Sequence, residues 1–237
     1  MKTKIQRANE RGFADHGWLR ANHSFSFANW YDPTKMHFGA MRVLNDDIIA
    51  GGKGFGAHPH DNMEIVTIPL SGAIAHKDST GTEGIISKGD VQIMSAGTGI
   101  THSEYNASKS ESLNLFQVWV FPKIKNIKPR YEQKTFHENE RINKWHIVAS
   151  PDEKDGGVWI NQDAIFSLSH AAKNTMLTYK NKFKGNGIYI MVIDGEVEVN
   201  GQVLNKRDAI EITDADEFSI DIKSDTDLLA VEVPMLQ

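Results

Sequence analysis

An internal repeat is the feature that most constrains how this chain can fold. An apolar run reaches Gly72, a hairpin-like segment follows, and an acidic turn opens the strand-like run 89–93. The same order recurs at Gly195 and at 207–212, with the two glycines 123 positions apart in a chain of 237 residues. An offset of about half the chain predicts two similar domains in tandem.

The local patterning in and around the repeat is typical of β-strands. Val197-Glu198-Val199 leads into Asn200-Gly201, a pair that suits the positive φ angles of a type I′ hairpin turn. Residues 218–222 alternate apolar and polar side chains, whereas Leu113–Phe121 is apolar on both faces and predicts a strand in the middle of a barrel. Helical periodicity is scarce, and Asn139–Lys144 is a candidate for one short helix. We therefore expect an all-β protein of sandwich or barrel type.

Composition excludes several classes of function. The chain contains no cysteine, which rules out disulfides, thiolate-bound zinc, iron–sulfur clusters and thiol nucleophiles. The formal charge is -5 with no basic stripe, so we expect no nucleic-acid partner. The longest aliphatic stretch, Ile188–Ile193, falls far short of the ~20 residues that span a bilayer. The N-terminus lacks the apolar region of a secretion signal, so we expect a cytoplasmic protein without a membrane partner.

Three histidines and one glutamate stand in two short segments with matching spacing. His58 and His60 are two residues apart, and so are His102 and Glu104. Residues i and i+2 of a strand project to the same face, so each pair presents its side chains together. Pro59 cannot donate to a strand ladder, which places its strand at a sheet edge or barrel mouth. If the two strands face each other inside a barrel, three imidazoles and a carboxylate converge.

Such a cluster predicts a divalent transition metal. Burying these polar groups without a partner would be costly, and imidazole with carboxylate suits iron, nickel, manganese, copper or zinc. Four protein ligands in an octahedral shell leave about two positions for water, oxygen or substrate, which indicates a catalytic rather than a closed structural site. Glu64 shares strand parity with His58 and His60 if no bulge intervenes. It could be a ligand, although we favour a role in orienting a ligand imidazole or a structural role.

Other candidate residues have plainer interpretations. The remaining histidines lack paired spacing, and we expect them on the surface or in ordinary hydrogen bonds: His16, His23, His37, His76, His137, His146 and His170. Phe25, Phe27, Trp30 and Tyr31 could line a pocket for a flat ligand, but core packing is the favoured interpretation. The glycine-rich run 51–56 lacks the spacing of a nucleotide-binding loop.

The motifs together resemble the pirin family of bicupins, and in particular its bacterial quercetin 2,3-dioxygenase members. The similarity is dense over residues 1–121 and looser beyond them, where it depends on Pro129–Gln133 and general strand patterning. The residues that carry it are Arg7–Gly12, His23–Ala28, His58-Pro59-His60, Glu64–Thr67, His76–Ser79, Gly89–Ile100 and His102-Ser103-Glu104.

The resemblance implies two tandem cupin barrels, each a double-stranded β-helix or jelly roll. Residues 1–125 would form the metal-binding N-terminal cupin, and residues 126–237 a C-terminal cupin whose metal site is lost, with Asn126–Arg130 as the link. The family's metal ligands correspond to His58, His60, His102 and Glu104. Its usual metal is iron, so Fe(II) is expected, with zinc, nickel, manganese, copper or cobalt as alternatives.

The activity implied by the resemblance is oxygenolytic ring opening of a flavonol such as quercetin, with release of carbon monoxide. The expected partners are a small aromatic, flavonol-like substrate and dioxygen, and the expected state is a monomer. Glu104 is the only implied ligand that can also act as a base at neutral pH, so we assign it abstraction of a substrate proton. Two alternatives stay open: a non-catalytic, redox-sensitive regulator that acts through a protein partner, and a cupin enzyme for another enol.

Overall fold

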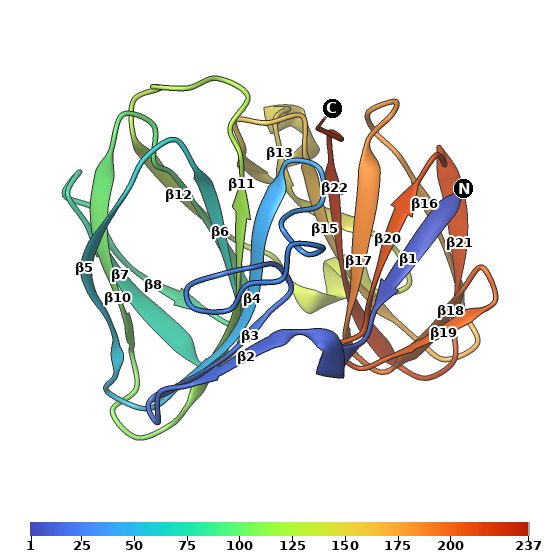
Figure 1. The fold of residues 1–237 in the computed structure, drawn as a ribbon, viewed down its shortest axis with the longest axis horizontal. Coiled ribbons are helices and arrows are strands. Elements are labelled where there is room, and N and C mark those ends of the chain that lie inside the picture. Colours follow the sequence, from blue (N-terminus) through green and yellow to red (C-terminus); the bar gives the residue numbers. More distant parts are fainter. Residues whose placement is uncertain (237) are drawn as a thin grey trace.

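The structure is a computed structural model that describes residues 1–236, and almost every regular element in it is a β-strand. Two barrels lie side by side, the N-terminal one drawn mainly in blue to green and the C-terminal one mainly in yellow to red (Figure 1). Three short 3-10 helices lie outside the sheets: η1 (Ala8–Glu10), η2 (Glu138–Arg141) and η3 (Glu153–Asp155). No helix in the described part of the chain has the length and apolar character needed to cross a membrane.

Each barrel consists of a large and a small antiparallel sheet. In the first barrel the large sheet has the spatial order β12 (Arg130–Thr135), β9 (Asp90–Ser95), β6 (Glu64–Ser71), β11 (Leu113–Val120), β4 (Met41–Ile49), β3 (Leu19–His23) and β2 (Gly12–Asp15). Its small sheet has the order β5 (Gly54–His60), β10 (Ile100–Asn106), β7 (Ala73–Asp78) and β8 (Glu83–Ser87).

The second barrel repeats this plan. Its large sheet has the order β1 (Lys2–Gln6), β20 (Ala209–Thr213), β17 (Gly187–Asp194), β22 (Thr226–Val233), β15 (Ile165–Ala171), β13 (His146–Ser150) and β14 (Val158–Trp159). Its small sheet has the order β16 (Met176–Lys180), β21 (Glu217–Ile222), β18 (Glu196–Val199) and β19 (Gln202–Asn205). The predicted all-β, two-cupin architecture is confirmed.

The internal repeat of the sequence corresponds to equivalent strands of the two barrels. Gly72, between β6 and β7, has a φ of 74°, and Gly195, between β17 and β18, has a φ of 93°. A Cβ atom at Gly195 would lie 2.3 Å from the Thr226 Oγ1 atom, so glycine is required there for space as well as for conformation. The predicted hairpin turn is also present, with φ of 50° at Asn200 and 72° at Gly201.

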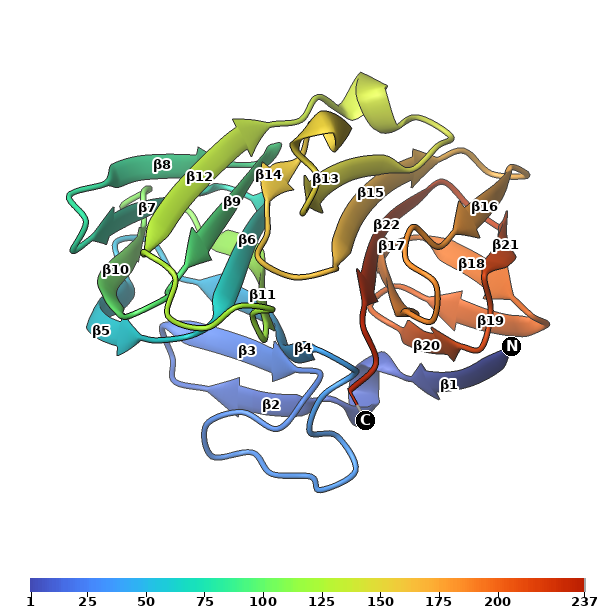
Figure 2. The same ribbon diagram turned by 90° about the horizontal axis from the view of Figure 1, so that it is seen from above.

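Two strands cross between the halves of the chain. β1 comes first in the sequence but pairs with β20 of the second barrel, and β12 follows residue 125 but pairs with β9 of the first. Seen from above, β1 lies beside β20 and β12 beside β9 (Figure 2). A boundary between residues 125 and 126 therefore leaves one strand of each barrel in the other half of the sequence.

The two large sheets pack against each other and form a core that both barrels share. Phe116 and Val118 on β11 and Tyr189 and Met191 on β17 all belong to this buried cluster. Because strand residues alternate in direction, the intervening residues point into the barrels: Ile190 reaches the apolar interior of the second barrel, while Gln117 lines a cavity inside the first. The interior of the first barrel is thus the polar one.

Candidate metal centre

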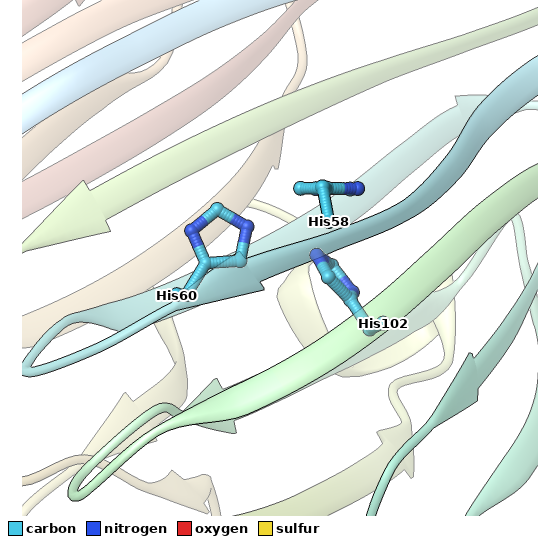
Figure 3. Close-up of side chains that lie close together, drawn as sticks. All are labelled: His58, His60 and His102. Atoms are coloured by element: carbon cyan, nitrogen blue, oxygen red, sulfur yellow. The ribbon is translucent and has the colours of Figure 1, made fainter.

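The centre is built on β5 and β10, which are neighbouring strands of the small sheet. β5 is the edge strand, as its Pro59 predicts, and His102 on β10 lies directly opposite His58 in the strand register. His58, His60 and His102 direct their rings toward one another from the two strands (Figure 3). The ring centroids are 4.4 Å apart for His58 and His102, and 4.9 Å apart for each of the other two pairs.

The ligand atoms of these three histidines all lie within 4.8 Å of one another. A second group with the same spread consists of His76, His102 and Glu104, so His102 belongs to both groups. The structure therefore brings together the three predicted imidazoles. It places the carboxyl group of Glu104 beside His102. The β5–β10 register shifts between His102 and Glu104, so that Glu104 pairs with Phe55.

Glu104 is held by a short chain of hydrogen bonds. Gln117 Nε2 donates to Glu104 Oε2 over 2.9 Å, and Trp119 Nε1 donates to Gln117 Oε1 over 3.1 Å. Burial raises the pKa of Glu104 to about 7, and the Gln117 hydrogen bond offsets part of this rise. Glu104 also lines the cavity, so its carboxyl group is both positioned by the protein and accessible to a ligand.

The donor set fits a divalent cation. His102 is 2% exposed, and its Nε2 is a buried atom with no hydrogen-bond partner among residues 1–236. The Nδ1 atom of His58 lies 2.8 Å from the carbonyl oxygen of Gly56, an acceptor that requires the proton on Nδ1 and leaves a lone pair on Nε2. Burial, with the neighbouring imidazoles, lowers the pKa of His60 to about 4 and that of His102 to about 3. Both rings are thus neutral at pH 7, as metal ligation requires.

A cavity of about 260 Å³ opens beside the cluster. Phe27, Phe55 and Trp119 provide its aromatic walls, with Phe27 and Trp119 edge to face at 5.4 Å. Of the aromatic residues singled out in the sequence, Phe27 lines this cavity, Phe25 lies in the core and Tyr31 is exposed. Flat apolar walls beside polar donors are typical of a site for an aromatic small molecule.

Asp47 is a cavity residue that the sequence analysis did not identify. It lies on β4 and lines the cavity with Asn45, two residues earlier, whose Oδ1 is 2.8 Å from His23 Nδ1. Burial, together with the charges of Asp46 and Glu104, raises the pKa of Asp47 to about 8. The available signal was the run Asn45-Asp46-Asp47, which is polar and lies between the apolar pairs Val43-Leu44 and Ile48-Ile49 of the same strand.

Two further sequence expectations have clear outcomes. Glu64 does not continue the histidine strand, because the chain turns at Asn62, which has a φ of 43°, and Glu64 begins β6 of the other sheet. Its Oε2 accepts hydrogen bonds from Ser95 and from the Asn161 backbone of the second barrel, which is a structural role. His76, expected on the surface or in an ordinary hydrogen bond, is 2% exposed and bonded to Asp78.

Comparison with known proteins places the chain in a family. The family model described as Pirin matches residues 4–120, and the one described as quercetinase C-terminal cupin domain matches residues 147–233. The quercetin 2,3-dioxygenase of Escherichia coli K12 is 43% identical over 97% of this chain and 98% of its own length. A pirin-like protein of Caulobacter vibrioides is 42% identical over 93% of this chain and 95% of its own.

The structural comparison agrees with this assignment. The crystal structure of the Escherichia coli bacterial pirin YhhW in complex with nickel(II) has a TM-score of 0.93 and 41% identity, covering 99% of this chain and all of that one. The histidine cluster, the two barrels and both family models lead to one assignment: this chain belongs to the pirin family and is a pirin-type, metal-binding cupin oxidoreductase.

Proposed function

We propose that this protein is a metal-dependent dioxygenase that opens the ring of a flavonol such as quercetin, with one dioxygen consumed for each carbon monoxide released. The observation that carries the proposal is the convergence of three imidazoles and one carboxyl group beside an aromatic-walled cavity. The 43% identical relative named quercetin 2,3-dioxygenase supports the choice of substrate.

His58, His60, His102 and Glu104 are the residues that would hold the metal ion. We propose Fe(II), while the nickel(II) in the YhhW structure and the nitrogen and oxygen donor set support several divalent ions as occupants. When bound, such an ion supplies positive charge that stabilises an oxyanion and leaves room for small ligands. The second barrel holds no comparable cluster within the described residues.

The protein's own residues then act on the substrate. The Phe27 and Trp119 rings bind and orient the flat ring system and exclude water from the cavity. Glu104 accepts the proton of the flavonol 3-hydroxyl, while Gln117 fixes the carboxyl group through Oε2.

The test combines elemental analysis of the purified protein with oxygen-electrode and carbon monoxide assays on quercetin. Wild type should retain about one transition-metal ion per chain and release carbon monoxide in step with oxygen uptake. Glu104→Gln should keep most of the metal and lose about 100-fold in turnover, because general-base catalysis contributes about 10²–10⁴-fold. His58→Ala should lose metal, and His170→Ala, a histidine of the second barrel, serves as the matched control with normal metal and activity.

Other outcomes would contradict the proposal. A preparation that never retains a transition metal removes the basis of the site, and full activity of Glu104→Gln removes the base role. Oxygen uptake with other enols or catechols but not with quercetin, with products identified by mass, would assign the same site to a different substrate.

A further inference from the structure

His102 is connected to two buried residues that do not line the cavity beside the histidine cluster. Its Nδ1 lies 3.4 Å from Nδ1 of His76, which is a long hydrogen bond. The Nε2 atom of His76 in turn lies 2.9 Å from Oδ2 of Asp78, and both side chains have no exposed surface. His76 and Asp78 alternate on β7, which pairs with β10 so that Asp78 is opposite His102.

The acceptor at the end of this chain of contacts determines where each proton lies. The other oxygen of Asp78, Oδ1, accepts hydrogen bonds from the backbone nitrogens of Thr80 and Thr82, at 2.8 and 3.3 Å, and from the Thr80 hydroxyl at 2.6 Å. A carboxylate can only accept hydrogen bonds, so His76 donates to it from Nε2, and the Nδ1 atom of His76 is the acceptor that faces His102. His102 therefore donates from Nδ1, and its Nε2 is left as a bare lone pair.

This proton arrangement accounts for the unpartnered Nε2 atom of His102. The His102 Nε2 atom is buried without a hydrogen-bond partner in the described chain, which would be costly unless it faces a cation. We propose that Asp78 and His76 are positioning residues that hold His102 in the tautomer able to bind a metal ion through Nε2. The proposal depends on the metal role given to His102 above and does not depend on the substrate.

The variant Asp78→Asn tests this logic because it should reverse the proton arrangement. The two backbone N–H groups of Thr80 and Thr82 require the amide oxygen at the Oδ1 position, so the amide NH₂ must face His76. His76 would then accept at Nε2 and carry its proton on Nδ1, which requires His102 to accept at Nδ1 and to carry its own proton on Nε2. The metal-binding lone pair would be lost without a change in shape.

The primary readout is the affinity for Ni(II) alone, measured by competition with a chromophoric chelator. Asp78→Asn should weaken binding about 10- to 100-fold, the range found when partners of ligand histidines are removed. His76→Leu should weaken it less, because His102 is then free to take either tautomer. Asp227→Asn is the matched control: it breaks the 3.1 Å His170–Asp227 pair of the second barrel and should leave the affinity unchanged.

The second readout is the tautomer itself, from the ¹⁵N resonances of the histidine rings in chelator-treated protein, assigned by single histidine substitutions. Wild-type His102 should be protonated on Nδ1, and the Asp78→Asn protein should have the proton on Nε2. A wild-type His102 protonated on Nε2, an Asp78→Asn affinity within twofold of wild type, or a loss of affinity with an unchanged tautomer would each overturn the proposal. Neither readout uses a substrate, so failure of quercetin cleavage does not affect this test.

Discussion

At the scale of single residues, Asp47 extends a carboxyl group into the cavity, and its Oδ1 has no hydrogen-bond partner among residues 1–236. A buried acid without partners costs stability and is retained where it serves a ligand. We expect Asp47→Asn to raise stability by about 1–3 kcal/mol at pH 7, since it removes the acid and keeps the shape. The same change should raise the KM for quercetin while the metal content stays constant.

Calorimetry and steady-state kinetics check this pair of effects, with Asp46→Asn as the control. Asp46 is the adjacent residue, but it faces the second barrel, where its Oδ2 lies 2.8 Å from Arg207. That control should lower the melting temperature and leave the KM unchanged. A drop in melting temperature for Asp47→Asn would show that its carboxyl group stabilises the fold instead.

The sequence predicts the histidine cluster well because the relevant rule is local. His58 and His60, and also His102 and Glu104, have the i, i+2 spacing of one strand face, and β5 and β10 happen to be paired neighbours. The contact of His76 with His102 depends on the pairing of β7 with β10, which no local sequence pattern predicts. Glu64 does not share the face of His58 and His60, because Asn62, with a φ of 43°, ends their strand, and Glu64 has the structural role that was among those favoured from the sequence.

At the scale of elements, the loops that precede and follow the histidine strands are tied together at the mouth of the first barrel. Asn62 donates its backbone N–H to the Gly97 carbonyl over 2.9 Å, and Thr98 donates to the Ile127 carbonyl over 3.0 Å. Gly97 has a φ of 49°, and a Cβ atom there would lie 2.0 Å from the Ile127 carbonyl oxygen. The segment that connects the barrels thus packs directly on the turn before β10.

We expect Gly97→Ala to destabilise the protein by about 3 kcal/mol or more, because left-handed strain and a backbone clash add together. Gly81→Ala is the control: its φ is 90°, but no atom lies within 4 Å of the added Cβ, so only strain of about 1–2 kcal/mol applies. Urea unfolding measures both values. Equal losses for the two variants would show that the Ile127 segment moves aside without cost.

The elements themselves were predictable to different degrees. The Asn200-Gly201 hairpin and the doubly buried strand β11 follow from turn chemistry and apolar patterning over a few residues. The sheets that β1 and β12 join could not be predicted from such local patterns, because each strand pairs with a sheet formed mainly by the other half of the chain. The helix expected over Asn139–Lys144 is present only as a single 3-10 turn, η2 (Glu138–Arg141), which covers part of that range.

At the scale of the whole molecule, the two barrels share a core, so we expect them to unfold together. Phe116 and Phe166, from different barrels, are both fully buried in this cluster, and β1 would lose its partner strand if the barrels separated. Calorimetry of chelator-treated protein should therefore give one transition, with equal calorimetric and van't Hoff enthalpies. Two separate transitions would show that each barrel is stable without the other.

Glu64 provides a pH-dependent link between the barrels. Its Oε2 accepts from Ser95 Oγ at 2.7 Å and from the Asn161 backbone nitrogen of the second barrel at 3.1 Å, while Oε1 has no partner in the described structure. Burial raises its pKa to about 7 from 4.5, although the bonds from Asn161 and Ser95 oppose the rise. The folded protein therefore holds a proton that the unfolded chain releases between these two pH values.

Since the folded state binds more protons in that window, the wild-type free energy of unfolding should fall as pH rises from about 4.5 to about 7, by up to about 3 kcal/mol from this group. Glu64→Gln keeps an oxygen acceptor for both bonds and has no proton to release, so its advantage over wild type should grow from pH 5 to pH 8. Urea unfolding at unit pH steps measures this difference.

Glu217→Gln, at an exposed position of β21, is the control, and its free energy of unfolding should follow that of wild type at every pH. A Glu64→Gln advantage that stays constant across the range would mean that Glu64 is ionised in the folded protein and that the two barrels are joined by a charge.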